Sequence, residues 1–536
     1  PHPRLAKPPA LFGPARRNSS GWDLSVAAER EALARAVSAC DGAPILAGAI
    51  LSGEAMLQRA AQPVLCPADR TRQVGQVCWS APEDVGQALA AATAAQPAWN
   101  ARGGQKRAII LRAMGDALER EMACLIALLA REAGRSLADG VDEVREAVDF
   151  CRYYAAEAER HFAAPMALPG PAGETNTLEL SGRGVFACIS PWNFPLAIFT
   201  GQIAAALAAG NCVLAKPAEQ TPLIAFVAVR LFHAAGLPTD VLHLLQGGGE
   251  IGAQICADPR IAGVAFTGST QTAQAINRAL AARDGPIATL IAETGGLNGM
   301  FVDTTALKEQ VVDDALLSAF GSAGQRCSAL RVLFLPSASA DGVIETLIGA
   351  LAELQLGDPA DPRTDIGPVI DAAAKEALDA HVEKMGAQAK ILARAVLPTA
   401  CAKGVFFAPT LVELPDLALL QREVFGPILH IVRYEAGQLP QMAAALAAKG
   451  YGLTCGVHSR LESFARVVQA ALPAGNVYVN RSMIGAVVGV QPFGGQGLSG
   501  TGPKAGGPHY VARFAQERTV SINITAQGGD PSLLNL

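Results

Sequence analysis

Aromatic and charged residues are both scarce in this sequence. Aromatic side chains make up 5% of the 536 residues, which is too few for the stacking surfaces that hold single-stranded nucleic acids. Charged residues make up 17%, and the formal net charge is −5. Such a chain has no electrostatic reason to bind nucleic acid or an anionic membrane. We therefore expect no nucleic-acid partner.

Paired cysteines and metal-ligand spacings are also missing. The eleven cysteines occur singly, without a C-x-x-C pair, and the eight histidines are isolated too. This pattern is typical of a reduced, cytoplasmic protein, and it argues against a disulfide framework and against a metal site. No signal peptide opens the chain. Because residue 1 is Pro rather than Met, we expect the chain to be a fragment of a longer polypeptide.

One stretch without charges is long enough to resemble a membrane span. No charged residue occurs from Gly184 to Ala215. Pro191, Asn193 and Pro195 interrupt this stretch, however, so it predicts a buried strand, a turn, a buried helix and a second buried strand. We expect no membrane insertion.

Half of the residues are apolar, and their order predicts an α/β fold. Helical spacing between residues 84 and 162 predicts amphipathic helices that break near Gly134 and Gly140. From Val185 to Thr267 predicted strands and helices alternate, which is typical of a parallel sheet covered by helices. A second α/β series extends from about residue 300 to 479. The length suggests three or four structural units.

Three segments lie outside these series. Residues 1–45 combine a Pro-rich, basic arm with an Ala-rich helix over 26–40, and we interpret them as a wrapping extension. Residues 171–181 resemble a β-hairpin. The strand-like tail at 519–525 is expected to pair with a hairpin of another subunit, which predicts a homo-oligomer, at least a dimer.

Cys327 is the strongest candidate nucleophile. It lies between a cation, Arg326, and small polar residues, at a predicted helix N-terminus. Both features favour the thiolate, which is the nucleophilic form of cysteine. A single cysteine is nevertheless more often a small buried residue than a nucleophile.

Glu293 and Asn193 are candidates to assist such a nucleophile. Glu293 closes an apolar strand and precedes two glycines, a position that faces a cleft or an ion-paired strand end. Asn193 lies in a turn between two prolines, where its amide either donates to a developing oxyanion or makes an ordinary turn contact. The two interpretations of each residue are about equally probable from the sequence.

A dinucleotide site is predicted at the ends of the strands in the first series. Lys216 and Glu219 follow one strand, where they can hold the hydroxyls of an adenosine ribose, and an acidic group there favours NAD over NADP. Gly268 and Ser269 open a helix after another strand, which suits a pyrophosphate. The G-x-G-x-x-G pattern is uninformative because it occurs twice, at 247–252 and 495–500.

The order of these short motifs resembles the aldehyde dehydrogenase superfamily along nearly the whole chain. The matching segments are Ser190–Pro195, Lys216–Pro222, Phe266–Ser269, Glu293–Gly296, Gly324–Cys327, Glu423–Pro427 and Pro492–Gly495. A narrower resemblance, in the segments 11–19, 480–495 and 500–508, is to the glutamate γ-semialdehyde dehydrogenase half of bifunctional proline utilization A. The proline dehydrogenase half of that family has no counterpart in this sequence and is the expected partner domain.

This resemblance implies an aldehyde dehydrogenase fold with a Rossmann-like NAD-binding domain, an α/β catalytic domain and a small oligomerization arm. The implied divisions are an N-terminal arm (1–45), an NAD-binding domain (46–165 and 183–294), an oligomerization hairpin and tail (166–182 and 518–536) and a catalytic domain (295–517). The implied reaction is NAD-dependent oxidation of L-glutamate γ-semialdehyde through a cysteine thiohemiacetal and thioester.

The resemblance also implies roles for individual residues. Cys327 is the nucleophile, Asn193 holds the oxyanion and Glu293 is the base that activates water. The implied NAD-binding residues are Ser190, Pro191, Trp192, Lys216, Glu219, Gly268, Ser269, Glu423 and Phe425. The implied substrate-binding residues are Ser328, Gly485, Ala486, Phe194 and Phe493, with Arg326 supporting the charge balance near the nucleophile.

Three alternatives keep the fold and change the activity. The substrate is another ω-semialdehyde, such as succinate semialdehyde, or the domain is non-catalytic, or CoA rather than water receives the acyl group. The presence of Cys327, Glu293 and Asn193 argues against a non-catalytic domain, and Glu293 as a water-activating base argues against CoA.

Overall fold

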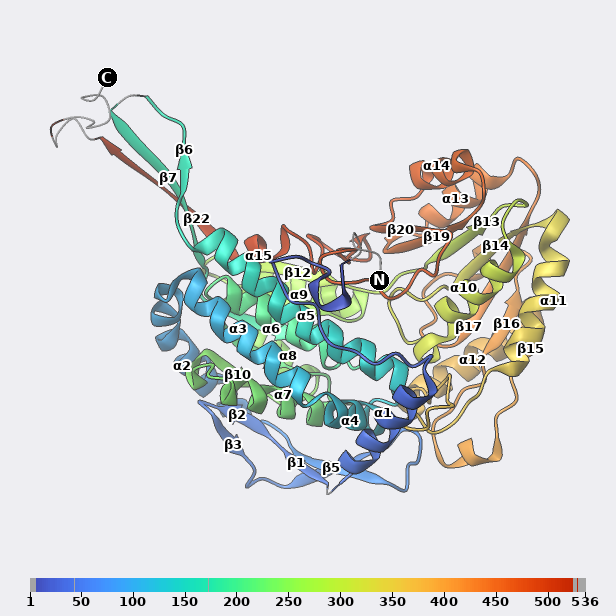
Figure 1. The fold of residues 1–536 in the computed structure, drawn as a ribbon, viewed down its shortest axis with the longest axis horizontal. Coiled ribbons are helices and arrows are strands. Elements are labelled where there is room, and N and C mark those ends of the chain that lie inside the picture. The colour runs from blue at the N-terminus through green and yellow to red at the C-terminus, as the bar shows by residue number, and fades with distance from the viewer. Residues whose placement is uncertain (1–5, 43, 172, 524–527, 529–536) are drawn as a thin grey trace.

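The chain forms two α/β lobes, each built on a seven-stranded sheet, and a narrow three-stranded arm that projects from the first lobe (Figure 1). This computed structural model describes residues 6–42, 44–171, 173–523 and 528. Within these ranges no helix combines the length and the apolar character needed to cross a membrane.

The first sheet has the strand order β12-β11-β8-β9-β10-β2-β3. From β12 to β10 the neighbouring strands are parallel, and β2 and β3 are antiparallel additions at one edge. Its strands are β2 (Ala49–Leu51), β3 (Glu54–Met56), β8 (Val185–Ile189), β9 (Cys212–Lys216), β10 (Leu242–Leu244), β11 (Ile261–Thr267) and β12 (Thr289–Glu293). The uncharged stretch of the sequence forms β8, α6 and β9, all deep in this lobe, which accounts for its lack of charge.

Helices cover this sheet on both sides. They are α2 (Pro82–Ala101), α3 (Gly103–Arg120), α4 (Met122–Glu132), α5 (Leu137–Phe162), α6 (Ala197–Ala208), α7 (Pro222–Ala234), α8 (Gly249–Ala257) and α9 (Thr270–Ala281). The predicted break near Gly134 is present, with φ +67° at that glycine and Ser136 capping α5. The predicted break at Gly140 is wrong. Gly140 lies inside α5, where its small size lets Ile126 of α4 approach closely.

The second sheet has the order β15-β16-β17-β14-β13-β19-β20 and is parallel except for β15. Its strands are β13 (Gly299–Val302), β14 (Val332–Pro336), β15 (Lys390–Arg394), β16 (Thr410–Glu413), β17 (Ile428–Tyr434), β19 (Thr454–His458) and β20 (Asn476–Val479). The helices of this lobe are α10 (Lys308–Phe320), α11 (Ser337–Glu353), α12 (Ala372–Gln388), α13 (Leu439–Ala447) and α14 (Glu462–Ala471). The predicted second α/β series corresponds to this lobe.

The projecting arm is the antiparallel sheet β22-β7-β6, formed by β6 (Met166–Leu168), β7 (Glu174–Gly182) and β22 (Ala515–Asn523). The predicted hairpin is therefore present. The expected pairing of the tail with another subunit is not what this chain shows, because β22 pairs with β7 of the same chain, with Thr519 opposite Leu178. Residues 524 and 525 of the predicted tail strand lie outside the described residues.

Smaller elements complete the chain. Strands β1 (Ile45–Ala47), β4 (Ala61–Leu65) and β5 (Gln73–Cys78) form a separate sheet, and β18 (Tyr451–Gly452) pairs with β21 (Gln496–Gly497). The predicted N-terminal helix is α1 (Ala27–Cys40), and α15 (Tyr510–Arg513) precedes β22. The expectation that the cysteines are unpaired is wrong for two of them, because a disulfide joins Cys40 of α1 to Cys124 of α4.

Each lobe has its own hydrophobic core, and the last segment of the chain returns to the first one. Val488, Tyr510, Phe514 and Ala515 are buried among residues of α5, α6 and β8. The Asn211 side chain donates a hydrogen bond to the Phe514 carbonyl at 3.0 Å. The return of residues 485–515 places this segment beside the end of β12, where Glu293 forms a β-bridge with Gly500.

Candidate active site

Cys327 lies in a turn between the two lobes' sheets, after a short 3-10 segment at Gly321–Gly324. The predicted helix N-terminus at this cysteine is wrong, because the chain continues from the turn into β14 without a helix. Asn298 fixes this turn, because its side-chain amide donates hydrogen bonds to the carbonyls of Cys327 at 2.7 Å and Ala329 at 2.9 Å. The sulfur therefore has a defined position.

The environment of the thiol keeps its proton in place. Burial raises the pKa of Cys327 to about 12, and repulsion from Glu423 and Glu293 acts in the same direction. Arg326 does not offset this effect, because its guanidinium turns away to Asp139 at 2.7 Å and to Ser322 at 2.8 Å. The expectation of a thiolate stabilised by Arg326 is thus wrong for the free site, and the thiol needs a base when it reacts.

Asn193 lies close to this turn. It follows β8, is buried, and donates a hydrogen bond from its amide to the Gln325 carbonyl at 3.1 Å, two residues before Cys327. An amide held in this way can donate its second proton to an oxygen that forms next to the sulfur.

Glu293 ends β12 and turns toward the returning C-terminal segment. The Gly495 N–H donates to its Oε2 at 3.0 Å, and its Oε1 is buried and has no hydrogen-bond partner among the described residues. Burial raises the pKa of Glu293 to about 8, while the Gly495 N–H and the charge of Lys504 act in the opposite direction. A carboxylate with this pKa can accept a proton near neutral pH.

A cavity of about 110 Å³ brings Cys327 and Glu293 together with the predicted substrate residues, whereas Asn193 is not among the residues that line it. Cys327 and Glu293 both line it. The other predicted residues in its wall are Phe194, Arg326, Ser328, Gly485, Ala486 and Phe493. These residues come from the ends of β8 and β12, the cysteine turn and the returning segment, so four distant parts of the sequence form one site.

The cavity also contains a carboxylate that the sequence analysis missed. Glu146 and Phe150, one turn apart on α5, line the same wall. Burial raises the pKa of Glu146 to about 8, and no described residue donates a hydrogen bond to its carboxylate. No motif marks Glu146, but an acidic residue in the apolar stripe of a predicted helix is a signal that could have identified it.

The predicted cofactor residues gather at the carboxyl edge of the first sheet. Ile189 of β8 is in register with Lys216 of β9, and Thr267 of β11 with Glu293 of β12. Ser190 and Pro191 therefore follow β8, and Gly268 follows β11, at this same edge. Ser269 caps α9 by accepting a hydrogen bond from the Thr272 N–H at 3.1 Å, so the N–H groups of that helix face the edge.

Lys216 and Glu219 differ in exposure. The Lys216 ammonium is buried, and its hydrogen-bond partner is the Pro217 carbonyl at 2.9 Å. Since an ammonium has three protons, it retains capacity for ribose oxygens. Burial lowers the pKa of Lys216, while Glu219 and Glu250 raise it. Glu219 is exposed beyond the strand end.

Glu423 enters from the second lobe. It accepts a hydrogen bond from Arg331 at 3.0 Å, and its carboxylate lies so close to Gly295 that a Cβ there would be 1.7 Å from Oε2. A larger residue at that position would displace the Glu423 carboxylate. Phe425, nearby, packs edge-on against Trp192 with ring centroids 5.6 Å apart. Residues of the two lobes thus pack against each other here.

The sequence matches the aldehyde dehydrogenase family over residues 56–520. This chain belongs to the aldehyde dehydrogenase family. It is 48% identical to the bifunctional protein PutA of Escherichia coli (strain K12) over 97% of this chain and 39% of that protein. It is 34% identical to the 1-pyrroline-5-carboxylate dehydrogenase of Geobacillus sp. (strain WCH70) over 85% of this chain and 88% of that enzyme.

Solved structures with the same aldehyde dehydrogenase fold come from the same two kinds of protein. A crystal structure of a bifunctional proline utilization A (PutA) protein aligns with a TM-score of 0.90 and 50% identity, covering 98% of this chain and 50% of that one. The 1-pyrroline-5-carboxylate dehydrogenase from Thermus with bound NAD aligns at 0.88 and 31% identity, over 95% and 99% of the two chains. The chain spans about two fifths of the PutA relative from E. coli.

Proposed function

We propose that this chain oxidises L-glutamate γ-semialdehyde to L-glutamate with NAD as the hydride acceptor. The observation that carries this proposal is the pairing of Cys327 with Glu146 in one cavity. No described residue donates a hydrogen bond to this half-buried carboxyl group, and burial raises its pKa to about 8 by disfavouring the charged form. A simple aldehyde brings no cation to this group, whereas an α-ammonium group on the substrate would stabilise its carboxylate form.

The rest of the cavity is suited to the remaining parts of the same molecule. Backbone N–H groups at Gly485 and Ala486, with the Ser328 hydroxyl, can hold an α-carboxylate. The rings of Phe194 and Phe493 can hold the short methylene chain between the two ends. Arg326 supports Phe194, since its guanidinium lies 5.2 Å from that ring, and does not grip the substrate.

The proposed mechanism begins with attack of the Cys327 sulfur on the aldehyde carbon, which forms a C–S bond while the thiol proton passes to the Glu293 carboxylate and from there to solvent. Asn193 and the Cys327 N–H hold the oxygen of the thiohemiacetal. Oxidation then removes a hydride from that carbon and leaves a thioester on Cys327; NAD held by the strand-edge residues would supply the hydride acceptor. Glu293 removes a proton from water as the water oxygen attacks the thioester. The C–S bond then breaks, the sulfur takes the proton that Glu293 holds, and the γ-carboxyl group leaves and releases its own proton to solvent.

The cofactor assignment rests on the fit of the strand-edge residues to NAD. We propose that Lys216 and Glu219 hold the adenosine ribose and that Gly268 and Ser269 approach the pyrophosphate. Glu423 and Phe425 contact the nicotinamide ribose. Ser190, Pro191 and Trp192 contact NAD between its adenosine and nicotinamide ends. A relative solved with bound NAD supports this assignment.

We propose the domain division and assembly that follow from this assignment. The NAD-binding domain comprises 46–165 and 183–294, the catalytic domain 295–517, the arm 1–45, and the oligomerization region 166–182 with 518–536. A cytoplasmic homodimer, with a proline dehydrogenase domain in the parent chain, is the proposed setting. The match to bifunctional PutA proteins supports that partner.

The test replaces Glu146 by Gln and measures NADH formation with glutamate γ-semialdehyde and with succinate semialdehyde. Losing a charged hydrogen bond to the ammonium should raise KM for the amino-acid aldehyde roughly 10- to 100-fold. The KM for succinate semialdehyde should stay the same or fall, because that substrate has no ammonium. The exposed Glu121→Gln is the matched control.

Cys327→Ala should abolish turnover of both aldehydes. If the unsubstituted enzyme prefers succinate semialdehyde, or if Glu146→Gln affects both substrates equally, the amino-acid substrate is wrong while the aldehyde chemistry stands.

A further inference from the structure

Residues 6–25, within the N-terminal arm, lie along helix α5 (Figure 1). Arg16 in this part contacts Val488, in the loop that carries Gly485 and Ala486. The reaction described above assigns no role to this arm. Yet Arg16 is only 7% exposed, and a buried arginine needs specific partners to offset the loss of its hydration.

Arg16 has partners on three sides. Its guanidinium forms an ion pair with Asp149 of α5, with Nη1 3.1 Å from Oδ1, and both side chains are almost fully buried. It also stacks on Phe12 at 3.7 Å from the ring centroid. Its Nη2 donates a short hydrogen bond to the Val488 carbonyl, which belongs to the loop of residues 485–491.

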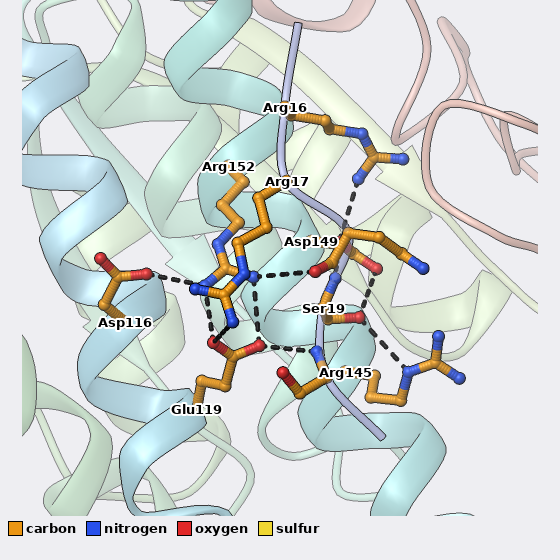
Figure 2. A network of polar contacts seen from close by, with 10 residues as sticks. Arg16, Arg17, Ser19, Asp116, Glu119, Arg145, Asp149 and Arg152 are labelled. Atoms are coloured by element: carbon orange, nitrogen blue, oxygen red, sulfur yellow. Dashed lines mark hydrogen bonds and ion pairs between the residues drawn. The ribbon is translucent and has the colours of Figure 1, made fainter. Parts of the chain in front are cut away.

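The arm itself is fixed around Asp149, as Figure 2 shows. Ser19 donates to the two oxygens of Asp149, from its N–H at 3.2 Å and from its hydroxyl at 2.8 Å, and Arg145 donates to the Ser19 hydroxyl at 3.3 Å. The next N–H, of Ser20, donates to Glu119 at 2.6 Å. Glu119 is held in turn by Arg152 at 2.8 Å. The backbone that follows Arg16 is therefore held on the surface of α5 and α3 by the contacts of Ser19 and Ser20.

The loop of residues 485–491 rests on this anchored arginine. At Gly489 a Cβ would lie 3.0 Å from the Tyr153 ring and 3.2 Å from Arg16 Nη2, so the backbone packs directly on both. The Gly489 N–H donates to Gly506 O at 2.9 Å, and the Gly506 N–H donates to the Tyr154 hydroxyl at 2.9 Å. The rear of the loop is thus fixed, whereas Gly485 at its front has no atom near its Cβ position.

From these contacts we infer that Arg16 is a positioning residue for substrate recognition. It holds the Val488 carbonyl so that the N–H groups of Gly485 and Ala486 keep the orientation that receives the substrate's α-carboxylate. The inference rests on the proposed function of this site. It makes the arm a determinant of specificity for carboxylate-bearing aldehydes, although the arm does not touch the substrate.

Arg16→Met tests this inference, because methionine keeps an apolar stem under Phe12 and removes both polar contacts. The matched control is Arg17→Met, since Arg17 is exposed and its ion pair with Glu119 is long, at 3.9 Å. We would measure kcat and KM for glutamate γ-semialdehyde, succinate semialdehyde and propionaldehyde, the dissociation constant of NAD, and the melting temperature.

Arg16→Met should raise KM for the preferred carboxylate-bearing aldehyde roughly tenfold or more, with less change in kcat. The kcat/KM for propionaldehyde and the affinity for NAD should stay within twofold. Arg16→Lys, which can keep the pair with Asp149 or reach Val488, should recover part of the loss. Gly489→Ala, which pushes the loop away from Tyr153 and Arg16, should likewise raise KM for the carboxylate-bearing aldehyde and leave kcat/KM for propionaldehyde unchanged.

Other outcomes overturn the inference. If propionaldehyde turnover falls in parallel with the melting temperature, Arg16 is merely structural. If Arg17→Met has the same effect, the contact with Val488 is irrelevant. An unsubstituted enzyme that prefers succinate semialdehyde refutes the proposed substrate but leaves the Arg16 comparison decisive with that substrate. An enzyme with no preference for either carboxylate over propionaldehyde refutes the inference.

Discussion

At the scale of single residues, the balance between Glu293 and Lys504 controls the pH response of the site. Atoms of both residues surround Gly494, where a Cβ would lie 2.6 Å from Glu293 Oε1 and 3.2 Å from the Lys504 Cα. Burial raises the pKa of Glu293 to about 8, and the positive charge of Lys504 limits this rise. In the proposed mechanism Glu293 activates water only when it is unprotonated, so turnover should increase as the pH rises through about 8.

Lys504→Met should move this rising limb to higher pH by about one pH unit, because it removes the charge that favours the Glu293 carboxylate. Lys504→Arg should leave the limb in place. The measurement is the pH dependence of kcat between pH 6 and 10, on the order of ten points, with a burst experiment to show that thioester hydrolysis limits the rate. An unchanged limb in Lys504→Met would exclude an electrostatic role for Lys504.

The sequence predicted those site residues that belong to short contiguous motifs. Glu293 ends β12, Asn193 lies in the turn after β8 and Cys327 lies in the turn that precedes β14, so local sequence determines where each of them is placed. The sequence did not identify Glu146 as a site residue, because only the packing of α5 brings that side chain to the cavity. It also failed for the ionisation of Cys327, since the orientation of Arg326 depends on Asp139, which is distant in sequence.

At the scale of elements, the disulfide between Cys40 and Cys124 fastens α1 to α4 across 84 residues of sequence. Cross-linking a loop of that length stabilises the folded state by roughly 4–5 kcal/mol in the chain-entropy picture. Cys124→Ser, or reduction by dithiothreitol, should therefore lower the melting temperature by several degrees. Dithiothreitol should have no effect on Cys124→Ser. Thiol titration that finds all eleven cysteines free in the native, unreduced protein would contradict the pairing.

Regular elements were predictable where one local pattern dominates. The alternation from β8 to β11 follows from buried strands between turn residues, and Ser269 marks the start of α9 through its capping side chain. The disulfide was not predictable, because the packing of α1 on α4 brings Cys40 to Cys124. The break predicted at Gly140 was wrong because a glycine can end a helix or can lie inside one where a neighbouring helix packs closely. Gly140 lies inside α5 and packs against α4.

At the scale of the whole molecule, the arm of β6, β7 and β22 is the part with least internal support. It extends away from both lobes (Figure 1), and the exposed fractions of Met166 and Ile522 are 60% and 45%. Exposed apolar residues on an unsupported sheet indicate a partner surface. We propose that a second copy of the chain covers it.

Light scattering after gel filtration should then give the mass of a dimer. Ile522→Lys should shift the protein toward monomer, while Ser521→Lys, on the opposite face of the strand, should not. Equal masses for the two variants and the unsubstituted protein would rule out this face as the contact.

The return of the C-terminal segment to the first core also has a consequence for biosynthesis. Val488, Tyr510, Val511, Phe514 and Ala515 complete a core whose preceding member is Ala292. A ribosome adds about 5–20 residues per second, so the growing chain waits roughly 10 to 45 seconds between the last strand of the first sheet and the residues that close its core. During that interval an apolar surface beside α5 and α6 is open to solvent, while the second lobe is being synthesised. Chaperones that bind nascent chains should therefore stay on the first lobe until the residues that complete its core have been synthesised, and not only until its last strand has been made.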